Sequence, residues 1–450
     1  MTEHGVRWTT EQVLALAPDA ASRKAGSKLG AAGPWSGAGG SGEGTVWGLC
    51  KGSGSRPYQT VVDLADAAGP AYKCSCPSRK FPCKHALGLL LLWAGGADAV
   101  PVAEQAPDWA EQWLTGRRER AQAKQDGNGG SSLAADPEAA RRRAERRAER
   151  VTAGATELEQ RLADLLRGGL AAAEQAGYGL WEETAARMVD AQAPGLASRV
   201  RDLGSIPGSG PGWPVRLLEE CALLHLLDQG WLRRDRLPAG LAATVRSRVG
   251  VPAQADGPPV SDRWLVLAQY DTADPKLTTR RIWLYGAESG HTRLLLSYGA
   301  AGRAPELSLP VGLALDAELS VFPGTGQSRA ALGERFAAPA PAAVRPPGLS
   351  PAEAAARYGE ALGEDPWLES VPVTLASVIP TPDGDTWQLA DPATESALPL
   401  TPAARSRPGL WRLVALSGGG PVTVFGECGH HGFTPLTAWP EGPGEPVTLC

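Results

Sequence analysis

Three cysteines and one histidine lie within twelve residues of one another, in the pattern C-x-C-x6-C-x-H. Thiolate and imidazole are the ligands that zinc prefers, at roughly 2.3 and 2.0 Å respectively. Four protein ligands leave no open coordination position, so the cluster predicts one structural Zn²⁺ and not a metal that activates water. The alternative is that these are buried cysteines without a metal. The predicted ligands are Cys74, Cys76, Cys83 and His85.

The segments on either side of the cluster indicate how its ligands would converge. Residues 71–76, AYKCSC, predict a β-strand, in which Cys74 and Cys76 would point to the same face because side chains alternate. Two prolines interrupt the connection that follows, and an apolar run then predicts a helix that begins near Cys83. We therefore expect the zinc ion at the junction between a small sheet and a helix.

Basic residues surround the cluster in the sequence. Their charges can offset the net charge of three thiolates around Zn²⁺, about −1 formally, and they favour the deprotonated thiols. Together with Tyr58, Tyr72 and Phe81, they could also bind the phosphates and stack on the bases of a nucleic acid. The other interpretation is that the module docks a protein or has a purely structural role. The candidate contact residues are Lys73, Arg79, Lys80 and Lys84.

Three other patterns in the sequence predict structure more readily than chemistry. Residues 428–431, CGHH, offer metal ligands without a partner cluster and favour a hairpin turn. Cys221 and His225 are four residues apart on a predicted helix, and core packing explains both most simply. Glutamates interrupt the arginines of residues 141–150, which favours a solvated helix face over a phosphate-binding surface.

The motifs of the common enzyme classes are absent from the sequence. It contains no HExxH, GxSxG or protein-kinase motifs and no phosphate-binding loop. We therefore predict no catalytic residues and no enzymatic activity, and the sequence identifies no small-molecule substrate.

The composition indicates a multidomain protein of a reducing compartment. At 450 residues the chain is too long for one ordinary core. Its net charge of −5 argues against a generally basic surface, although residues 1–150 carry 20 Lys and Arg against 16 Asp and Glu. Seven cysteines, four of them scattered, do not form a disulfide framework. Without a secretion signal or a membrane-length apolar segment, we expect a cytoplasmic protein with no membrane partner.

The hydrophobic periodicity predicts an α+β multidomain protein with a zinc-stapled sheet-and-helix module, a helical middle domain and a β-rich C-terminal domain. Residues 33–44 are glycine-rich and predict a flexible loop, whereas residues 136–172 predict one long helix. Further on, residues 351–362 predict a helix and residues 409–418 a strand. The C-terminal region could be a sandwich or a barrel. The predicted divisions are 1–105 with a zinc-finger core at 45–95, a helix and flexible linker at 106–132, the helical domain at 133–252 and the β-rich region at 260–450.

The ligand pattern, with strands before it and a helix after it, resembles the SWIM zinc finger. The resemblance covers about residues 45–95, and it places the ligands of that family on the four residues named above. Relatives of this finger occur in bacterial proteins, Snf-type helicases, plant transposases and some ubiquitin-ligase proteins. The longer run from WGLCKGSGS to KHALGLLLLWA looks like a group of actinobacterial SWIM proteins with long tails. The resemblance implies a zinc-stabilised module that binds DNA or protein, and it does not imply an enzyme.

These observations lead to one main functional hypothesis and two alternatives. The main hypothesis is a zinc-binding interaction protein whose structural zinc module recognises DNA or a protein partner. The first alternative is an accessory subunit of an ATPase or a similar machine, which would act only through protein–protein contacts. The second is an unrecognised enzyme within residues 260–450, for which the sequence offers no catalytic constellation.

Overall fold

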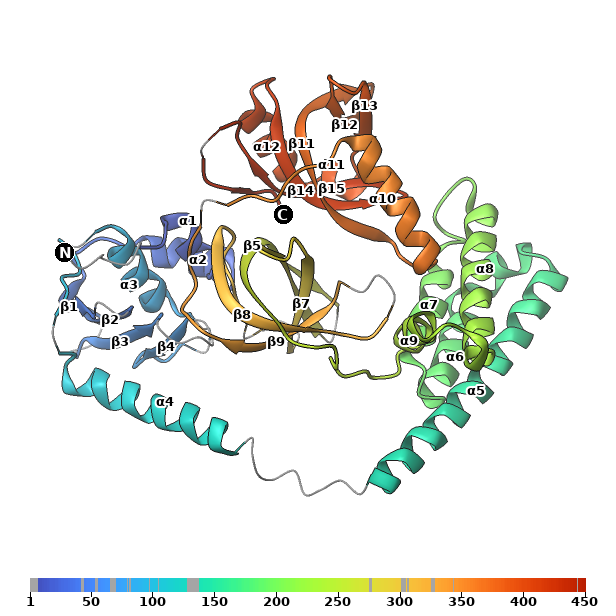
Figure 1. Cartoon of the computed structure of the whole chain (residues 1–450), viewed down its shortest axis with the longest axis horizontal. Helices are drawn as coiled ribbons and strands as arrows, with labels where there is room; N and C mark the ends of the chain where they lie inside the picture. Colours follow the sequence, from blue (N-terminus) through green and yellow to red (C-terminus); the bar gives the residue numbers. More distant parts are fainter. Residues whose placement is uncertain are drawn as a thin grey trace.

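The computed structural model contains, in its described part, three β-sheets and a group of packed helices (Figure 1). The first sheet and the helix bundle lie at opposite sides of the molecule, and the other two sheets lie between them. This arrangement confirms the predicted α+β class. The structure describes residues 7–41, 44–52, 56–64, 70–78, 80, 82–96, 98–103, 105–127, 137–274, 277–300, 305, 307–324, 328–342, 344–442 and 444–450, without the side chains of 120–127, 137, 140, 172 and 174–178.

The N-terminal module is a four-stranded antiparallel sheet with a helix on each face. Its elements are α1 (Thr10–Leu14), α2 (Ala20–Ser27), β1 (Trp35–Gly40), β2 (Thr45–Cys50), β3 (Tyr58–Asp63), β4 (Ala71–Cys74), α3 (Lys84–Ala94) and α4 (Asp108–Gly127). The strands lie side by side in chain order. Val46 and Val62 pack against α3, whereas Trp47 and Val61 on the opposite face pack against α4. The strand alternation therefore supplies apolar side chains to both faces of this sheet.

The glycine-rich segment is a strand and not the predicted flexible loop. β1 pairs with β2 from Trp35 opposite Cys50 to Gly40 opposite Val46. The glycines have a packing role, because a Cβ atom on Gly39 would lie only 3.0 Å from the indole nitrogen of Trp47. A side chain at position 39 would push β1 away from its neighbour. The loop prediction was wrong because composition alone does not reveal this close approach.

The middle of the chain is helical, as predicted. Its elements are α5 (Pro137–Gly168), α6 (Ala171–Asp190), α7 (Pro194–Ser205), α8 (Trp213–Leu232), the short 3₁₀ helix η1 (Arg234–Arg236) and α9 (Ala239–Val249). Their buried side chains, among them Leu158, Met188 and Leu224, form one apolar core. The helix predicted over 136–172 ends at Gly168, because Gly169 has a φ of +85° and redirects the chain.

The C-terminal region contains two six-stranded antiparallel sheets. The first has the order β10-β8-β5-β6-β7, with β9 also paired to β8, and the second has the order β13-β12-β11-β14-β15-β16. The strands of the first sheet are β5 (Val260–Ala273), β6 (Leu277–Gly286), β7 (Thr292–Ala300), β8 (Leu313–Val321), β9 (Ala330–Arg335) and β10 (Ala340–Pro341). Those of the second are β11 (Ser370–Asp383), β12 (Thr386–Asp391), β13 (Ser396–Pro399), β14 (Val422–Gly429), β15 (Gly432–Trp439) and β16 (Val447–Thr448).

Three helices accompany the second of these sheets. They are α10 (Pro351–Glu364), α11 (Pro402–Arg405) and α12 (Gly409–Ser417). The helix predicted near 351–362 is present, and Ser350 and Glu353 form a capping box at its start. The strand predicted at 409–418 is wrong, because this segment is α12. Its buried residues Leu410 and Leu413 have helical spacing, and Gly418 ends the helix in a left-handed conformation.

Apolar clusters join these parts across the boundaries predicted from the sequence. The core of the N-terminal module continues into the sheet of β5–β8, where Leu87 and Leu90 belong to the same cluster as Trp264 and Ile282. A second cluster joins the two C-terminal sheets through Trp283 and Phe425, among other residues. The N-terminal module is thus packed into the rest of the chain.

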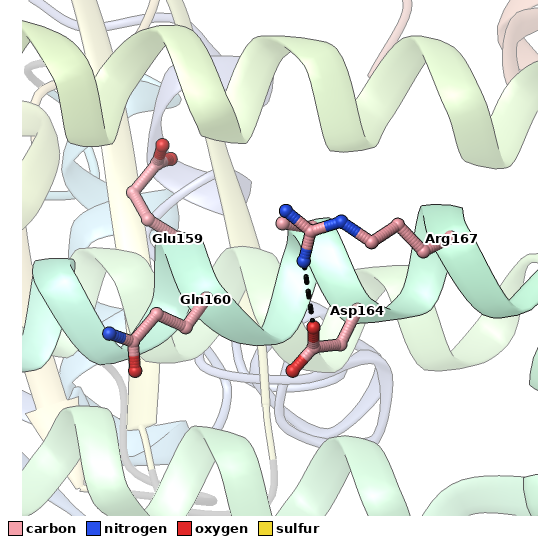
Figure 2. A pocket seen from close by; sticks show the side chains of 5 residues that line it. Glu159, Gln160, Asp164 and Arg167 are labelled. Atoms are coloured by element: carbon pink, nitrogen blue, oxygen red, sulfur yellow. Dashed lines mark hydrogen bonds and ion pairs between the residues drawn. The ribbon is translucent and has the colours of Figure 1, made fainter.

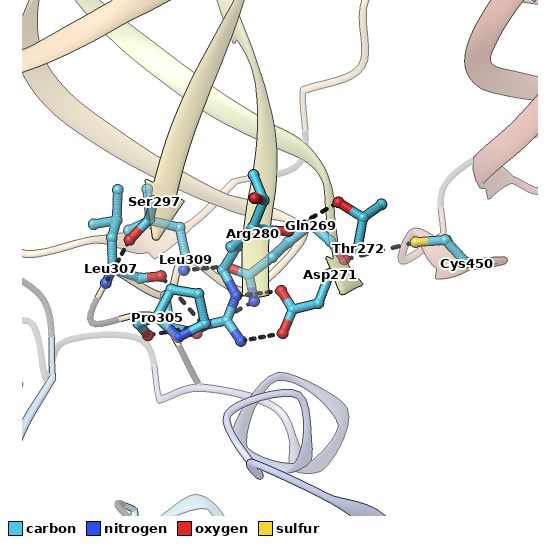
Figure 3. Close-up of polar contacts among 11 residues, drawn as sticks. Gln269, Asp271, Thr272, Arg280, Ser297, Pro305, Leu307, Leu309 and Cys450 are labelled. Carbon is cyan, nitrogen blue, oxygen red and sulfur yellow. Dashed lines mark hydrogen bonds and ion pairs between the residues drawn. The ribbon is translucent and has the colours of Figure 1, made fainter. Parts of the chain in front are cut away.

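Arg280 fixes a connecting segment beside this shared core (Figure 3). Its guanidinium donates two hydrogen bonds to Asp271, at 2.8 and 2.9 Å, and another to the carbonyl oxygen of Leu307 at 3.2 Å. Gln269 accepts a hydrogen bond from the backbone N–H of Leu309, whose side chain is fully buried. These contacts hold the segment before β8 against the sheet, so that Leu309 enters the core shared with the N-terminal module.

None of the helices in the described part of the chain has both the length and the apolar character needed to span a membrane.

Candidate metal centre

Two short segments position the four predicted ligands. Cys74 is the last residue of β4, and Cys76 lies in the bend that follows the strand. Cys83 is the N-cap of α3, and His85 lies in its first turn. The prediction that Cys76 belongs to the strand is wrong. The next residue, Pro77, has no N–H to donate to a neighbouring strand, so the strand does not continue through it. The bend after β4 therefore positions the thiol of Cys76.

The ligand atoms of Cys74, Cys76, Cys83 and His85 all lie within 4.8 Å of one another. The Sγ atom of Cys74 lies 3.7 Å from Nδ1 of His85. A tetrahedral zinc site with the usual bond lengths has ligand–ligand edges of about 3.5 Å, close to this distance. Three thiols and one imidazole thus fit a closed site for one structural Zn²⁺. Among the described residues, no other group of three or more Cys, His, Asp or Glu gathers in this way.

The surroundings of the cluster favour a thiolate at Cys74. Hydrogen bonding from the Cys83 thiol, and further hydrogen bonds from His85 and Thr60, lower the pKa of Cys74. Donation to Cys74 together with burial raises the pKa of Cys83. A zinc ion would bind all three sulfurs as thiolates, so zinc binding would release the remaining thiol protons.

Two residues of β3 support the ligands, and both lie on the face of the sheet that carries Cys74. The hydroxyl of Thr60 lies 3.3 Å from Cys74 Sγ, and the ring of Tyr58 stacks on His85 with 4.8 Å between centroids. Contacts of this kind orient metal ligands and tune their basicity. Sequence reasoning missed Thr60. The sequence signal that could have found it is the alternation of Tyr58, Thr60 and Val62 along β3. This alternation assigns the three residues to the face of the sheet that α3 covers.

The predicted contact residues differ in their surroundings. Lys73, Lys80 and Lys84 are all exposed. Lys80 forms an ion pair with Asp19, at the start of α2, and part of its charge is thereby compensated. Arg79 and Phe81 lie outside the described residues. Tyr72 is partly buried and packs against the core shared with β5–β8.

The helix that follows the zinc ligands is enclosed by the protein. Every residue of α3 from His85 to Leu92 is buried. α3 packs against α2 and the sheet, and its side chains belong to the core shared with β5–β8. A recognition helix must present a row of side chains to a DNA groove. α3 cannot do this in the folded chain.

Two family models match parts of the chain. The SWIM zinc finger matches residues 58–94, which run from β3 to the end of α3. The chain carries a SWIM zinc finger. A SWIM-associated four-helix bundle domain matches residues 146–249, from within α5 to the end of α9. No curated protein and no solved structure matches the chain.

The SWIM finger holds the predicted zinc site, and the other Cys and His candidates lie elsewhere. Cys428 is buried in β14, and His430 in the following turn lies 3.2 Å from the hydroxyl of Tyr358. These residues form the hairpin turn that the sequence predicts. Cys221 is buried in the bundle core, as predicted. His225 is not a core residue, because its side chain is 57% exposed and contacts Glu159 of α5.

The arginine run before the bundle is a solvated helix face, as its glutamates predicted. Arg141 and Arg142 form ion pairs one turn away on α5, with Glu145 and Glu138. Arg147 donates to the backbone carbonyls of Gln192 and Gly250, and it thus ties α5 to the ends of α6 and α9. Arg147 therefore helps to hold the bundle together.

Proposed function

We propose that this chain is a non-enzymatic interaction protein, in which the SWIM zinc finger is a structural base for binding a protein partner. One observation carries the proposal. α3, the element that would read a DNA groove, is buried from His85 to Leu92. The zinc site then serves folding, since four protein ligands close the coordination sphere. We place the protein in the cytoplasm, because a reducing compartment keeps three ligand thiols free.

The charge around the finger also favours a protein partner over DNA. Of the predicted contact cations that the structure describes, Lys80 forms an ion pair with Asp19, whereas Lys73 and Lys84 are exposed and extend into solvent. They lie on different elements, β4 and the first turn of α3. DNA-binding surfaces usually make six or more phosphate contacts at once. Even the full predicted set of four cations, Lys73, Arg79, Lys80 and Lys84, gives a weaker footprint.

The proposal is tested by measuring nucleic-acid binding of the full chain by fluorescence anisotropy, on duplex and single-stranded DNA, over a range of salt concentrations. We expect weak binding that does not change in the Lys73→Ala/Lys84→Ala variant. The matched control is Lys24→Ala/Lys28→Ala, which removes two exposed lysines, one in α2 and one at its C-cap. Tight binding that the first variant loses and the control keeps, with a salt slope lower by about 2, would show DNA recognition instead.

The protein-binding part is tested separately by cross-linking in the source cell, followed by mass spectrometry. We expect a reproducible partner whose cross-links fall on the folded chain and disappear in a Cys83→Ser variant that has lost zinc. A chain that forms no cross-links to other proteins would contradict the proposal. The accessory-subunit hypothesis is one form of this protein-binding proposal. It would hold if the cross-linked partner belonged to an ATPase or a similar machine.

A further inference from the structure

The helix bundle contains an apolar hollow between α5, α6 and α7. Its volume of about 300 Å³ falls at the lower end of the range for small-molecule sites. Apolar side chains from all three helices line it, among them Leu158, Leu180 and Val200. A hollow of this volume has room for about ten groups of the size of a water molecule. It can therefore hold a small organic molecule.

The lining of the hollow extends from the core of the bundle to its surface. Leu158, Val200 and Leu203 belong to the core, and each is at most 2% exposed. Leu180 of α6 is 41% exposed, and Gly168 at the end of α5 is also exposed. A ligand can therefore enter beside Leu180 and bury its apolar part against the core residues, as small molecules do in most protein sites.

The two charged side chains of the lining are already paired within the bundle. The guanidinium of Arg161 donates to the hydroxyl of Thr184 at 3.0 Å and to the carboxylate of Glu157 at 3.1 Å. The carboxylate of Asp164 accepts a hydrogen bond from Arg167 at 3.0 Å (Figure 2). Because both charges have partners of opposite sign on the protein, the hollow favours an uncharged ligand.

One polar group of the lining has no partner. Trp181 of α6 is 6% exposed, and its indole N–H has no hydrogen-bond acceptor in the described part of the chain. The ring lies close against α7, because a Cβ atom on Gly204 would lie 3.2 Å from its Cδ1 atom. Buried donors are normally paired, so an unpaired one needs an explanation. An acceptor on a molecule bound in the hollow would supply the missing partner.

We propose that this hollow binds a small, uncharged and mostly apolar molecule whose carbonyl oxygen accepts a hydrogen bond from the indole N–H of Trp181. The volume sets its size at about ten non-hydrogen atoms. The leucines and Val200 surround its apolar part, and Trp181 binds the single polar atom. Small ketones, aldehydes and esters form this chemical class.

The chemistry of the lining selects a carbonyl compound over other occupants. A carbonyl group brings neither a charge nor a further donor, so the complex leaves neither its oxygen nor the indole N–H unpaired. A buried water normally makes about three hydrogen bonds, and a lining whose charged side chains are already paired offers fewer. The hollow is separate from the zinc ligands on β4 and α3, so binding there does not depend on the protein-binding role proposed above.

The first test follows the indole N–H of Trp181 by proton–nitrogen correlation NMR, in the full chain with zinc and isotope-labelled tryptophan. The Trp181→Phe variant identifies the resonance by its absence. Titration with acetophenone should move it downfield with saturation, at a Kd of about 1 mM or less. The control probe is α-methylstyrene, which has the same shape but a methylene group in place of the carbonyl oxygen, and it should cause no downfield shift. No saturable shift with acetophenone, or the same shift with both probes, would overturn the proposal.

The second test places the bound probe in the hollow, with equilibrium dialysis as the measurement. Leu180→Glu puts a carboxylate in the apolar lining and should raise the Kd of acetophenone by at least about tenfold. The matched control is Val189→Glu, on the same helix, 48% exposed and outside the lining, and it should keep the Kd. Because both positions are exposed, both variants should fold, and circular dichroism verifies this. Equal affinity in the two variants would show that acetophenone binds elsewhere and would contradict the assignment.

Discussion

The ring of Tyr58 stacks on the imidazole of His85, with 4.8 Å between centroids and 37° between the planes. The two residues come from different elements, since Tyr58 begins β3 and His85 lies in the first turn of α3. This contact fixes the orientation of the imidazole while Nδ1 faces Cys74. A ligand held in this way is ready for the metal before the metal binds.

Tyr58→Ala should therefore weaken zinc binding about tenfold, the lower end of the range for residues that support metal ligands. The missing ring would let the imidazole rotate, while the four ligands remain. Tyr58→Phe keeps the ring and should keep the affinity. Competition with a chromophoric chelator measures both, and Tyr298→Ala, at an exposed tyrosine of β7, is the control. Equal zinc affinity for Tyr58→Ala and the unmodified chain would show that the stack has no such role.

Cys83→Ser should abolish stoichiometric zinc binding and loosen more than the finger. The core that surrounds α3 also contains Trp264 and Ile282 of β5 and β6. We therefore expect faster amide hydrogen exchange in α3 and also in those two strands, because metal binding contributes to folding. Metal analysis and exchange mass spectrometry test this. Cys221→Ser, in the bundle core, should keep one zinc per chain. Exchange that changes only within residues 58–94 would show that the finger folds independently.

Asp228 in α8 is fully buried, and neither of its carboxyl oxygens has a hydrogen-bond partner among the described residues. Burial, and then the nearby carboxylate of Glu159, raise the pKa of Asp228 to about 9. The folded chain thus holds one proton more than the unfolded chain between the ordinary aspartate pKa of about 4 and this raised value. Over that window the free energy of unfolding falls as the pH rises, by at most about 1.4 kcal/mol per pH unit.

Asp228→Asn should remove this pH dependence, because the amide carries no charge at any pH in the window. We expect a stability advantage for the variant that grows from acidic pH to about pH 9. Thermal unfolding across this range measures it, and Asp190→Asn, at the exposed end of α6, is the control. Parallel pH profiles for Asp228→Asn and the unmodified chain would mean that Asp228 has a similar pKa in the folded and unfolded states.

Glu427 of β14 links the two C-terminal sheets. Its carboxylate accepts hydrogen bonds from the hydroxyl of Tyr270 at 2.8 Å and from the indole N–H of Trp283 at 2.9 Å. Glu427→Ala would leave both donors unpaired and should lower the free energy of unfolding by about 2 kcal/mol. Glu427→Gln keeps an acceptor and should lose less. Chemical denaturation compares them with Glu445→Ala, at an exposed site. Equal losses in all three variants would exclude the linking role.

Much of the local structure follows from patterns in the sequence. The zinc ligands are predicted from their spacing, and the helices α5 to α9 lie within the helical domain predicted at 133–252. These features depend on neighbours in the chain, which a sequence displays directly. Residues 409–418 show where this reasoning fails. Their apolar residues are so closely spaced that they fit both the helical period of 3.6 residues and the strand period of two residues. Only the packing of Leu410 and Leu413 against the second C-terminal sheet selects the helix.

The sequence by itself determined the donor set of the metal site, because four ligands within twelve residues can converge through local geometry. Only the tertiary structure decided what surrounds that site. Burial of α3 from His85 to Leu92, the stack of Tyr58 on His85 and the core shared with Trp264 all depend on contacts between distant segments. The exposure of Val215, Leu218 and Leu226 on α8 also depends on the tertiary structure, because the sequence of a helix with apolar residues on two faces resembles that of a fully buried helix.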